Sequence, residues 1–417
     1  MELVAYGAQD IYLTGNPQIT FFKVVYRRHT NFSMESIEQT WLGNDITESE
    51  TTPGKCESII TRDGDLIYRM YLELTVSNPG SETDSTVGLV NTAVTINNIT
   101  SGLIDDIELQ IGGQRIDKQS GAWIETWAEL TEPNPDGIVS NYNTPGSGTL
   151  FQRMSGLGGC CSDSDFTTFF PDKNPKFFVP LSFWFCRNPG LALPLIALQY
   201  HEIKIILNHK INTQTHSFKT NKLWCDYIYL DTDERRRFAQ VSHEYLIEQV
   251  QEKSFPQKTI TTENLNFNHP VKELIFINYN DTGRDLEQIT ESNAEPTFKL
   301  VFNGSDRFRE RDYRYFTRTQ VYQHHTGNGL DTLFANVTEP LTGNSRDSIV
   351  GNIADTIGVY SFALKPEEHQ PSGTCNFSRI DSAQLIATGG LQLTHIFAVN
   401  YNVLRIMSGM GGLAYSN

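Results

Sequence analysis

Two clusters of carboxyl and imidazole side chains could, by residue type, hold a metal ion or transfer a proton. Glu367, Glu368 and His369 are consecutive, and His324 and His325 are adjacent. Consecutive residues of an extended chain point to opposite faces, so these side chains cannot easily share one ion. The sequence also has no His-x-His spacing, which would place two imidazoles on one face of a strand. We therefore predict no metal site, and a polar, turn-stabilising role for these residues.

Two basic runs could contact a phosphate backbone. Arg307–Phe316 interleaves arginines with aromatic rings, as single-strand nucleic-acid platforms do, and Asp233–Arg237 reads DERRR. Both runs also contain acidic residues, and the formal net charge of the chain is −16. Neutralising phosphates needs clustered cations, so we predict no specific nucleic-acid binding. The first run fits a solvated strand edge or a subunit interface, and the second a solvated helix face held by local ion pairs.

The sequence motifs of common enzymes are missing. No Gly-x-Ser-x-Gly, His-Glu-x-x-His or zinc-ribbon spacing occurs, and Ser408–Leu413 lacks the lysine of a phosphate loop, so a flexible tail is its plain interpretation. The six cysteines include no CxxC pair, which favours reduced thiols. We expect no signal peptide and no transmembrane helix. We predict no catalytic or cofactor-binding residue, and therefore no enzyme.

The residues between these clusters follow a pattern typical of many short β-strands. Leu66–Val76 alternates apolar and other residues, and Gly112-Gly113 separates two alternating runs as a hairpin turn would. Trp123, Trp127 and Leu130 have helical spacing and predict one short helix. Further strands are predicted at Pro180–Cys186, Glu202–Leu207, Leu223–Leu230, Tyr245–Val250, Glu273–Tyr279, Thr297–Asn303, Val359–Leu364, Cys375–Ile380 and Leu391–Ile406.

A charged, helix-prone segment, Asp231–Gln240, divides the predicted strands into two groups and predicts two β-sandwiches in tandem. We place an N-terminal arm at residues 1–24, a first sandwich at 25–235 and a second with a C-terminal tail at 236–417. The arm's apolar residues would need a neighbour to cover them. Long polar loops are predicted at Ser77–Gly102, Thr131–Pro175 and Thr326–Gly351.

The pattern alone leaves a jelly roll and an immunoglobulin-like sandwich both open. It also leaves open a carbohydrate-binding or carbohydrate-cleaving β-sandwich protein, because catalytic carboxylates converge only in the fold. Such a protein would show a concave strip of exposed Trp and Tyr with carboxylates nearby.

One segment, Tyr360–Asp381, reads YSFALKPEEHQPSGTCNFSRID. It resembles the signature segment of the major capsid proteins of large icosahedral double-stranded DNA viruses, of the iridovirus and phycodnavirus type. Gln9–Ser33, Tyr229–Phe238 and Asn400–Asn417 resemble the same family, whereas Ser382 departs from the Asn expected in many relatives. The signature residues are Tyr360, Phe362, Leu364, Pro366, Glu367, Glu368, His369, Gln370, Pro371, Gly373, Cys375, Asn376, Phe377, Arg379 and Asp381. The residues at the inter-domain hinge are Asp231, Asp233, Glu234, Arg235, Arg236 and Arg237.

The resemblance selects the jelly roll among the open folds. It implies an all-β chain of two consecutive eight-stranded antiparallel jelly-roll β-sandwiches, with long loop insertions and a few short helices. It implies a structural protein whose homotrimers are pseudo-hexagonal capsomers that tile an icosahedral shell. The implied partners are further copies of the chain, minor capsid proteins and an internal membrane beneath the shell, with surface glycans left open. The implied location is the virion capsid, assembled in a virus factory of the host cytoplasm.

Overall fold

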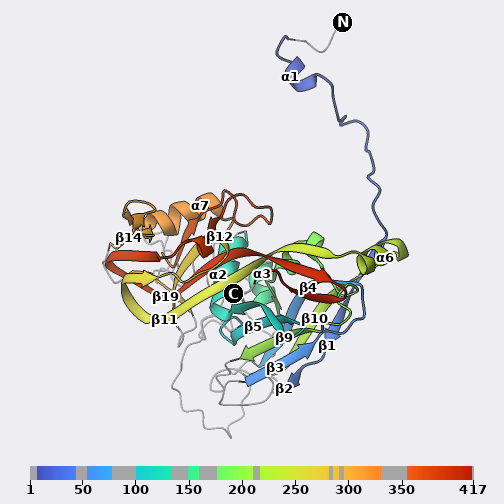
Figure 1. Ribbon diagram of the computed structural model, residues 1–417, viewed down its shortest axis with the longest axis horizontal. Helices are drawn as coiled ribbons and strands as arrows, with labels where there is room; N and C mark the ends of the chain where they lie inside the picture. The colour runs from blue at the N-terminus through green and yellow to red at the C-terminus, as the bar shows by residue number, and fades with distance from the viewer. Residues whose placement is uncertain are drawn as a thin grey trace, which may run out of the picture.

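The chain forms two antiparallel β-sandwiches, which confirms the predicted all-β, double jelly-roll class (Figure 1). The computed structural model describes residues 7–43, 54–77, 100–133, 149–158, 176–209, 217–280, 285–290, 295–327, 329 and 355–415. The greater part of each of the three predicted polar loops lies outside these residues.

The first sandwich consists of two facing sheets. One has the order β1-β10-β4-β7 with β8 beside β4, and the other has the order β2-β3-β9-β5-β6. Alternation along each strand buries one face, so that Leu72 and Leu74 of β4 have no exposed surface. The strands are β1 (Phe32–Gln39), β2 (Leu42–Gly43), β3 (Gly54–Ile59), β4 (Leu66–Ser77), β5 (Ile104–Ile111), β6 (Gln114–Ser120), β7 (Lys176–Pro180), β8 (Leu193–Pro194), β9 (Ile203–His209) and β10 (Ser217–Leu230).

Two long strands organise the second sandwich. The first half of β19 pairs with β14, and its second half pairs with β12, while β11 follows β19 along almost its whole length. Beyond β12 lies β17, so one layer has the order β11-β19-β12-β17. The strands are β11 (His243–Asn264), β12 (Pro270–Asn280), β13 (Asp285–Glu287), β14 (Thr297–Phe302), β15 (Ser305–Asp306), β16 (Arg311–Asp312), β17 (Ile357–Ser361), β18 (Cys375–Asn376), β19 (Ala383–Met407) and β20 (Met410–Leu413).

Short helices connect and cover the sheets. The helices are α1 (Ile11–Thr14), α2 (Gly121–Thr131), α3 (Leu150–Ser155), α5 (Trp184–Arg187), η1 (Pro189–Leu191), α6 (Thr232–Gln240), η2 (Tyr315–Thr319), α7 (Gln320–His324) and η3 (Phe377–Arg379). The helix predicted from the tryptophan spacing is α2, and the charged segment between the sandwiches contains α6. Within the described ranges, no helix has the length and apolar character needed to cross a bilayer.

Two strand predictions are wrong. Pro180–Cys186 ends β7 and then turns into α5, and the run that starts at Cys375 pairs over only two residues before η3. In the first case Phe183, Trp184 and Phe185 are all almost completely buried. A run that is buried on every side has no alternation that would distinguish a strand from a helical turn.

The C-terminal end is ordered, so the flexible-tail interpretation is wrong. Ser408 and Gly409, both at positive φ, form the turn between β19 and β20. The hairpin packs on the first sandwich, where the Tyr200 N–H donates to the Gly409 carbonyl over 2.9 Å. A Cβ added to Gly411 would lie 2.6 Å from a methyl carbon of Leu198, so a larger residue here would have to displace the Leu198 side chain.

The N-terminal segment extends away from both sandwiches (Figure 1). Residues 7–31 join no sheet, and β1 begins at Phe32. Large apolar side chains along the segment are exposed, with Phe22 at 97%. Exposed apolar surface of this extent is typical of a site where another surface binds.

Candidate assembly site

Helix α2 joins the two sandwiches. All its residues from Gly121 to Leu130 are buried, because one face lies in the first core and the other lies against the second sandwich. Trp123, with no exposed surface, stacks on Trp127 and meets the ring of Phe397 in β19 edge-on, each at a centroid distance of 5.2 Å. The Ser120 hydroxyl caps the helix by accepting a hydrogen bond from the Trp123 N–H.

The second sandwich supplies the donors that α2 lacks at its C-terminal end. The N–H groups of Gly327 and Gly329 donate to the carbonyls of Leu130 and Glu129 over 2.8 and 3.0 Å. The last carbonyls of a helix have no hydrogen-bond donor within the helix. These two bonds supply donors to carbonyls whose burial without a hydrogen bond would cost free energy. A Cβ on Gly327 would lie 2.3 Å from the Glu129 oxygen, which excludes every other residue type in this backbone position.

The signature segment adjoins this contact through Glu367. Its carboxylate accepts hydrogen bonds from the Thr326 N–H and hydroxyl, and it lies 3.0 Å from Nδ1 of His325. The other ring nitrogen of His325 lies 3.0 Å from the buried carboxylate of Glu273. Glu368 points away and pairs with Lys365, as expected for adjacent residues. The buried imidazole therefore connects the signature segment to β12.

His325 makes the stability of this region depend on pH. Burial alone would lower the pKa of His325, but the charges and hydrogen bonds of Glu273 and Glu367 outweigh burial and raise it to about 9. A folded-state pKa above the unfolded value stabilises the fold fully below about pH 6.5, and this contribution is lost as the pH rises through about 9. We therefore expect the free energy of unfolding to fall by up to about 3 kcal/mol over this interval.

Urea unfolding at several pH values between 6 and 9.5 measures this loss. His325→Gln should flatten the dependence, whereas His324→Gln, at the neighbouring half-buried position, should keep it. An unchanged slope in His325→Gln would show that other groups are responsible.

A second charged cluster joins both sandwiches to the signature segment. Glu248 of β11 lies 2.8 Å from the guanidinium of Arg187 in the first sandwich and 2.9 Å from Nζ of Lys272 in β12. The ring of His369 lies 3.6 Å from the same carboxylate, and Arg187 stacks over Trp127 of α2. Burial would raise the pKa of Glu248, but His369, Lys272 and Arg187 outweigh it and lower that pKa to about 2.

The remaining signature residues divide into a buried set and an exposed set. Phe362 and Phe377 pack on each other and on Phe302 of β14, and Pro366 is buried. The ring of Tyr360 contacts that of Phe308 at a centroid distance of 4.9 Å, while Cys375 is a half-buried free thiol. The exposed signature residues are Leu364, Glu368, Gln370, Pro371, Gly373, Asn376, Arg379 and Asp381.

The hinge residues lie on α6, where one of them makes a specific contact. Arg235 pairs with both carboxylate oxygens of Asp65, at 2.9 and 3.0 Å, and so fixes the helix to the start of β4. We expected the arginines of this helix to pair with acidic residues of the same helix. Arg235 instead pairs with a residue far away in the sequence. Asp231 caps the helix, and the exposed hinge residues are Asp231, Asp233, Arg235, Arg236 and Arg237, with Glu234 half-buried.

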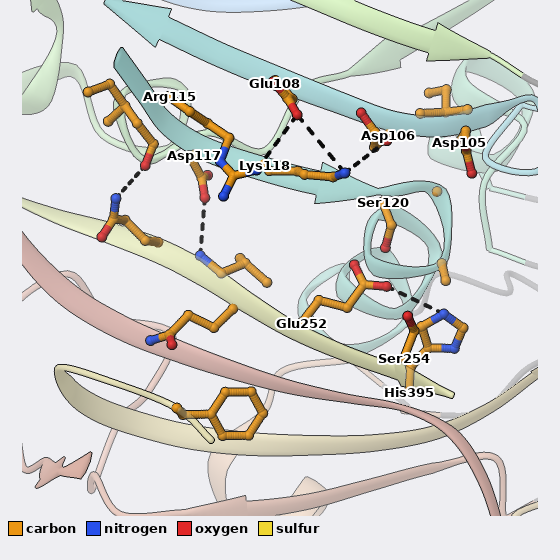
Figure 2. Close-up of a pocket in the computed structure, with 18 of the residues that line it drawn as sticks. Asp105, Asp106, Glu108, Arg115, Asp117, Lys118, Ser120, Glu252, Ser254 and His395 are labelled. Carbon is orange, nitrogen blue, oxygen red and sulfur yellow. Dashed lines mark hydrogen bonds and ion pairs between the residues drawn. The ribbon is translucent and has the colours of Figure 1, made fainter. Parts of the chain in front are cut away.

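A polar cleft of about 1400 Å³ lies between β5–β6 and β11 (Figure 2). Within it, Lys118 pairs with Asp106 at 3.0 Å, and Glu252 lies 3.4 Å from the ring of His395. Burial raises the pKa of Asp117 to about 6, and this carboxylate accepts a hydrogen bond from the Val250 N–H of the second sandwich. The aromatic lining residues that the structure describes are Phe255, Phe267, Tyr279 and His395. This cleft therefore lacks the strip of Trp and Tyr that a carbohydrate site would need.

The structure also bears on the basic run as a nucleic-acid platform and on the carboxyl and imidazole clusters as a metal site. In the basic run, Tyr313 and Phe316 are buried in the second core and cannot stack on bases. Among the described residues, no three His, Cys, Asp or Glu side chains form a group that could hold a metal ion. Of the described cysteines, Cys186, Cys225 and Cys375 are free thiols, and Sγ of Cys56 lies 3.8 Å from the Leu207 carbonyl.

Sequence reasoning missed the buried charges at the junction. Lys272 and Glu273 stand together inside the apolar strand β12, which is a signal that the sequence contains. When adjacent Lys and Glu residues lie between apolar residues of one strand and are buried, each charge needs an oppositely charged or hydrogen-bonding partner. Arg187 and His325 offer no such signal, because their partners come from distant strands.

Comparisons with known proteins match this chain to one kind of protein along its whole length. The family described as "Major capsid protein N-terminus" matches residues 20–231, and the one described as "Large eukaryotic DNA virus major capsid protein" matches residues 234–329 and 352–412. A major capsid protein of Pyramimonas orientalis virus is 49% identical, covering 100% of this chain and 99% of the relative. One of Paramecium bursaria Chlorella virus 1 is 37% identical with the same coverage. Among solved structures, a chain of the PBCV-1 virus capsid matches with a TM-score of 0.70 at 32% identity, covering 95% of this chain and 100% of that one.

Proposed function

Since the chain belongs to the large eukaryotic DNA virus major capsid proteins, we propose that three copies of it form a pseudo-hexagonal capsomer that tiles an icosahedral shell. The family membership itself makes the protein a structural component of the virion capsid and not an enzyme. The carbohydrate-binding alternative finds no support in these relatives.

One observation carries the trimer proposal. The two sandwiches are held together by α2, by the cap on its C-terminal end and by the Glu248 cluster, so one chain behaves as a rigid pair of similar blocks. Three such pairs related by threefold symmetry give six blocks around one axis, which approximates a hexagon. Cyclic threefold symmetry requires two different surfaces of each chain to meet. A permanent interface of this kind buries more than about 2,000 Å².

Further partners belong to the same proposal. The exposed apolar segment before β1 would face the inside of the shell, where minor capsid proteins and an internal membrane would cover it. The hinge helix α6 would fix the angle between the two sandwiches, and glycans could be attached to the outer surface of the shell. Assembly would take place in a virus factory of the host cytoplasm.

The native mass of the purified protein tests the proposal. We expect light scattering to give three times the chain mass of 47.2 kDa, and negative-stain images of the same peak to show hexagonal outlines. The mass should persist on dilution, because a large interface dissociates slowly. A stable species of one chain mass would contradict the proposed capsomer.

A further inference from the structure

The layer β11-β19-β12-β17 shows how a sheet of this protein is covered. Across it, Phe397, Ile275 and Val359 lie side by side on three neighbouring strands, next to Glu252 on β11. Helix α2 of the first sandwich packs on this row, and all three apolar side chains are fully buried. One of the contacts between the two blocks of one chain is therefore a helix lying on the outer face of a four-strand layer.

The corresponding layer of the first sandwich, β1-β10-β4-β7, has the same type of row. Trp224, Tyr71 and Pro180 lie side by side, next to Glu38 on the edge strand β1. The ring of Tyr71 stacks on that of Trp224 at 6.4 Å and meets that of Phe178 at 6.1 Å. The three aromatic side chains and Pro180 are only half-buried. No described helix covers them, although Phe238 of α6 covers Ile228 at one end of the face.

The second sandwich also carries a helix in the place that α2 has in the first. Helix α2 lies between β6 and β7, and the continuous helical segment η2–α7, Tyr315–His324, lies between β16 and β17. Phe316 packs into the second core, as Ile124 and Ala128 of α2 pack into the first, while Val321 lies in the junction cluster beside α2. None of the described residues covers its outer side, and Tyr322 is 87% exposed there.

We infer that the outer side of η2–α7 of one copy docks on the outer face of β1-β10-β4-β7 of the next copy. This inference rests on the proposed capsomer and names the two surfaces that form it. In Figure 1, α7 lies at the end of the molecule opposite to β1 and β10, so one chain cannot make this contact with itself. Within a chain the contact joins its own two blocks, and between chains it joins one block to a block of the next copy. Repeated three times, these contacts close a ring of six blocks. The contact between chains uses two different surfaces, as threefold symmetry requires.

The chemistry of the two surfaces is complementary. Tyr322 is a rigid amphipathic anchor, and its partner surface offers the aromatic faces of Trp224 and Tyr71, the residue types that dominate such interfaces. On the partner surface, Glu38 and Glu73 pair with Lys222 and Lys176, and on the helical segment Arg318 lies beside Tyr322. The side chain of Arg318 is 40% exposed although it already pairs with Asp355.

A charge placed at either surface tests the inference. Tyr322→Glu would replace the aromatic anchor by a carboxylate set against the rings of Trp224 and Tyr71, and Trp224→Glu would interrupt the aromatic row. We expect both variants to lose the three-chain species in light scattering, with the mass falling to one third. Tyr322→Phe and Tyr200→Glu, the latter at a 75% exposed tyrosine of the first sandwich, should keep it. Because Trp224 also contributes to folding, circular dichroism and urea unfolding must show that each variant is folded.

A cross-link gives a second, positive readout. A chain with both Tyr322→Cys and Tyr71→Cys should give ladders of two and three chains on oxidation, which either single variant should not. If the wild type is a trimer but the double variant does not cross-link and Tyr322→Glu remains a trimer, the inferred surfaces are wrong and the capsomer stands. If the wild type has one chain mass, both the capsomer and the inferred interface fall.

Discussion

Replacing Trp123 with alanine should lower the free energy of unfolding by about 3–5 kcal/mol, the usual loss for a large aromatic side chain removed from a core. Trp123 has no exposed surface and contacts Trp127 within α2 and Phe397 across the junction. Its loss would leave a cavity that neither sandwich can fill alone. We also expect unfolding to separate into two transitions, because the sandwiches would no longer stabilise each other.

Differential scanning calorimetry measures both effects. Phe298→Ala is the matched control, because Phe298 is equally buried but lies in the second core, stacked on Phe316. The control should lose a similar free energy without uncoupling the first sandwich. A single transition and a loss below about 1 kcal/mol in Trp123→Ala would show that α2 does not hold the junction.

Glu248→Gln should be comparably damaging at neutral pH, with an expected loss of about 3–5 kcal/mol. The substitution would leave Lys272, whose side chain has no exposed surface, without the carboxylate that neutralises it. The pKa of Glu248 is lowered to about 2, so its stabilisation is present above about pH 4.5 and is lost as the pH falls through about 2. The wild type should therefore lose stability in acid more steeply than the variant does.

Two further variants make this experiment decisive. Glu244→Gln, on the same strand, removes an exposed pair with Arg405 and should cost less than about 1 kcal/mol. Adding Lys272→Met to Glu248→Gln should restore much of the loss, because a buried charge is then replaced by an apolar chain of similar length. Chemical unfolding of all four proteins at pH 7 and pH 3 provides the comparison. Equal losses in Glu248→Gln and Glu244→Gln would show that the cluster adds no stability.

The sequence allowed the strands to be predicted where each strand buries a single face. Leu66–Val76 alternates because Leu72 and Leu74 point into one core, and Gly112-Gly113 adopts the positive φ that its hairpin turn requires. The spacing of the tryptophans predicted α2 for a similar reason. Its burial on all sides could not be predicted, because the second covering surface belongs to strands more than 100 residues away in the chain.

The charged contacts were the least predictable part of the candidate site. Glu367, Glu368 and His369 are adjacent in the sequence but have separate partners, which are His325, Lys365 and Glu248. Local pattern determines which faces a segment presents, whereas the partner of a buried charge depends on how whole sheets are placed. The same limit applies to Arg235, whose partner Asp65 lies at the start of a strand in a different part of the chain.

The position of the C-terminal hairpin has a consequence for synthesis. The core of the first sandwich includes Leu404 and Ile406 of β19, and Leu413 of β20 packs against it. These residues are translated after all the other residues of the first core, so the N-terminal half of the polypeptide cannot complete its core before they are made. A product that terminates early would therefore expose the apolar surface around Leu198 and be left to chaperones and proteases. Only chains translated through Leu413 would have a finished first block to contribute to a growing shell.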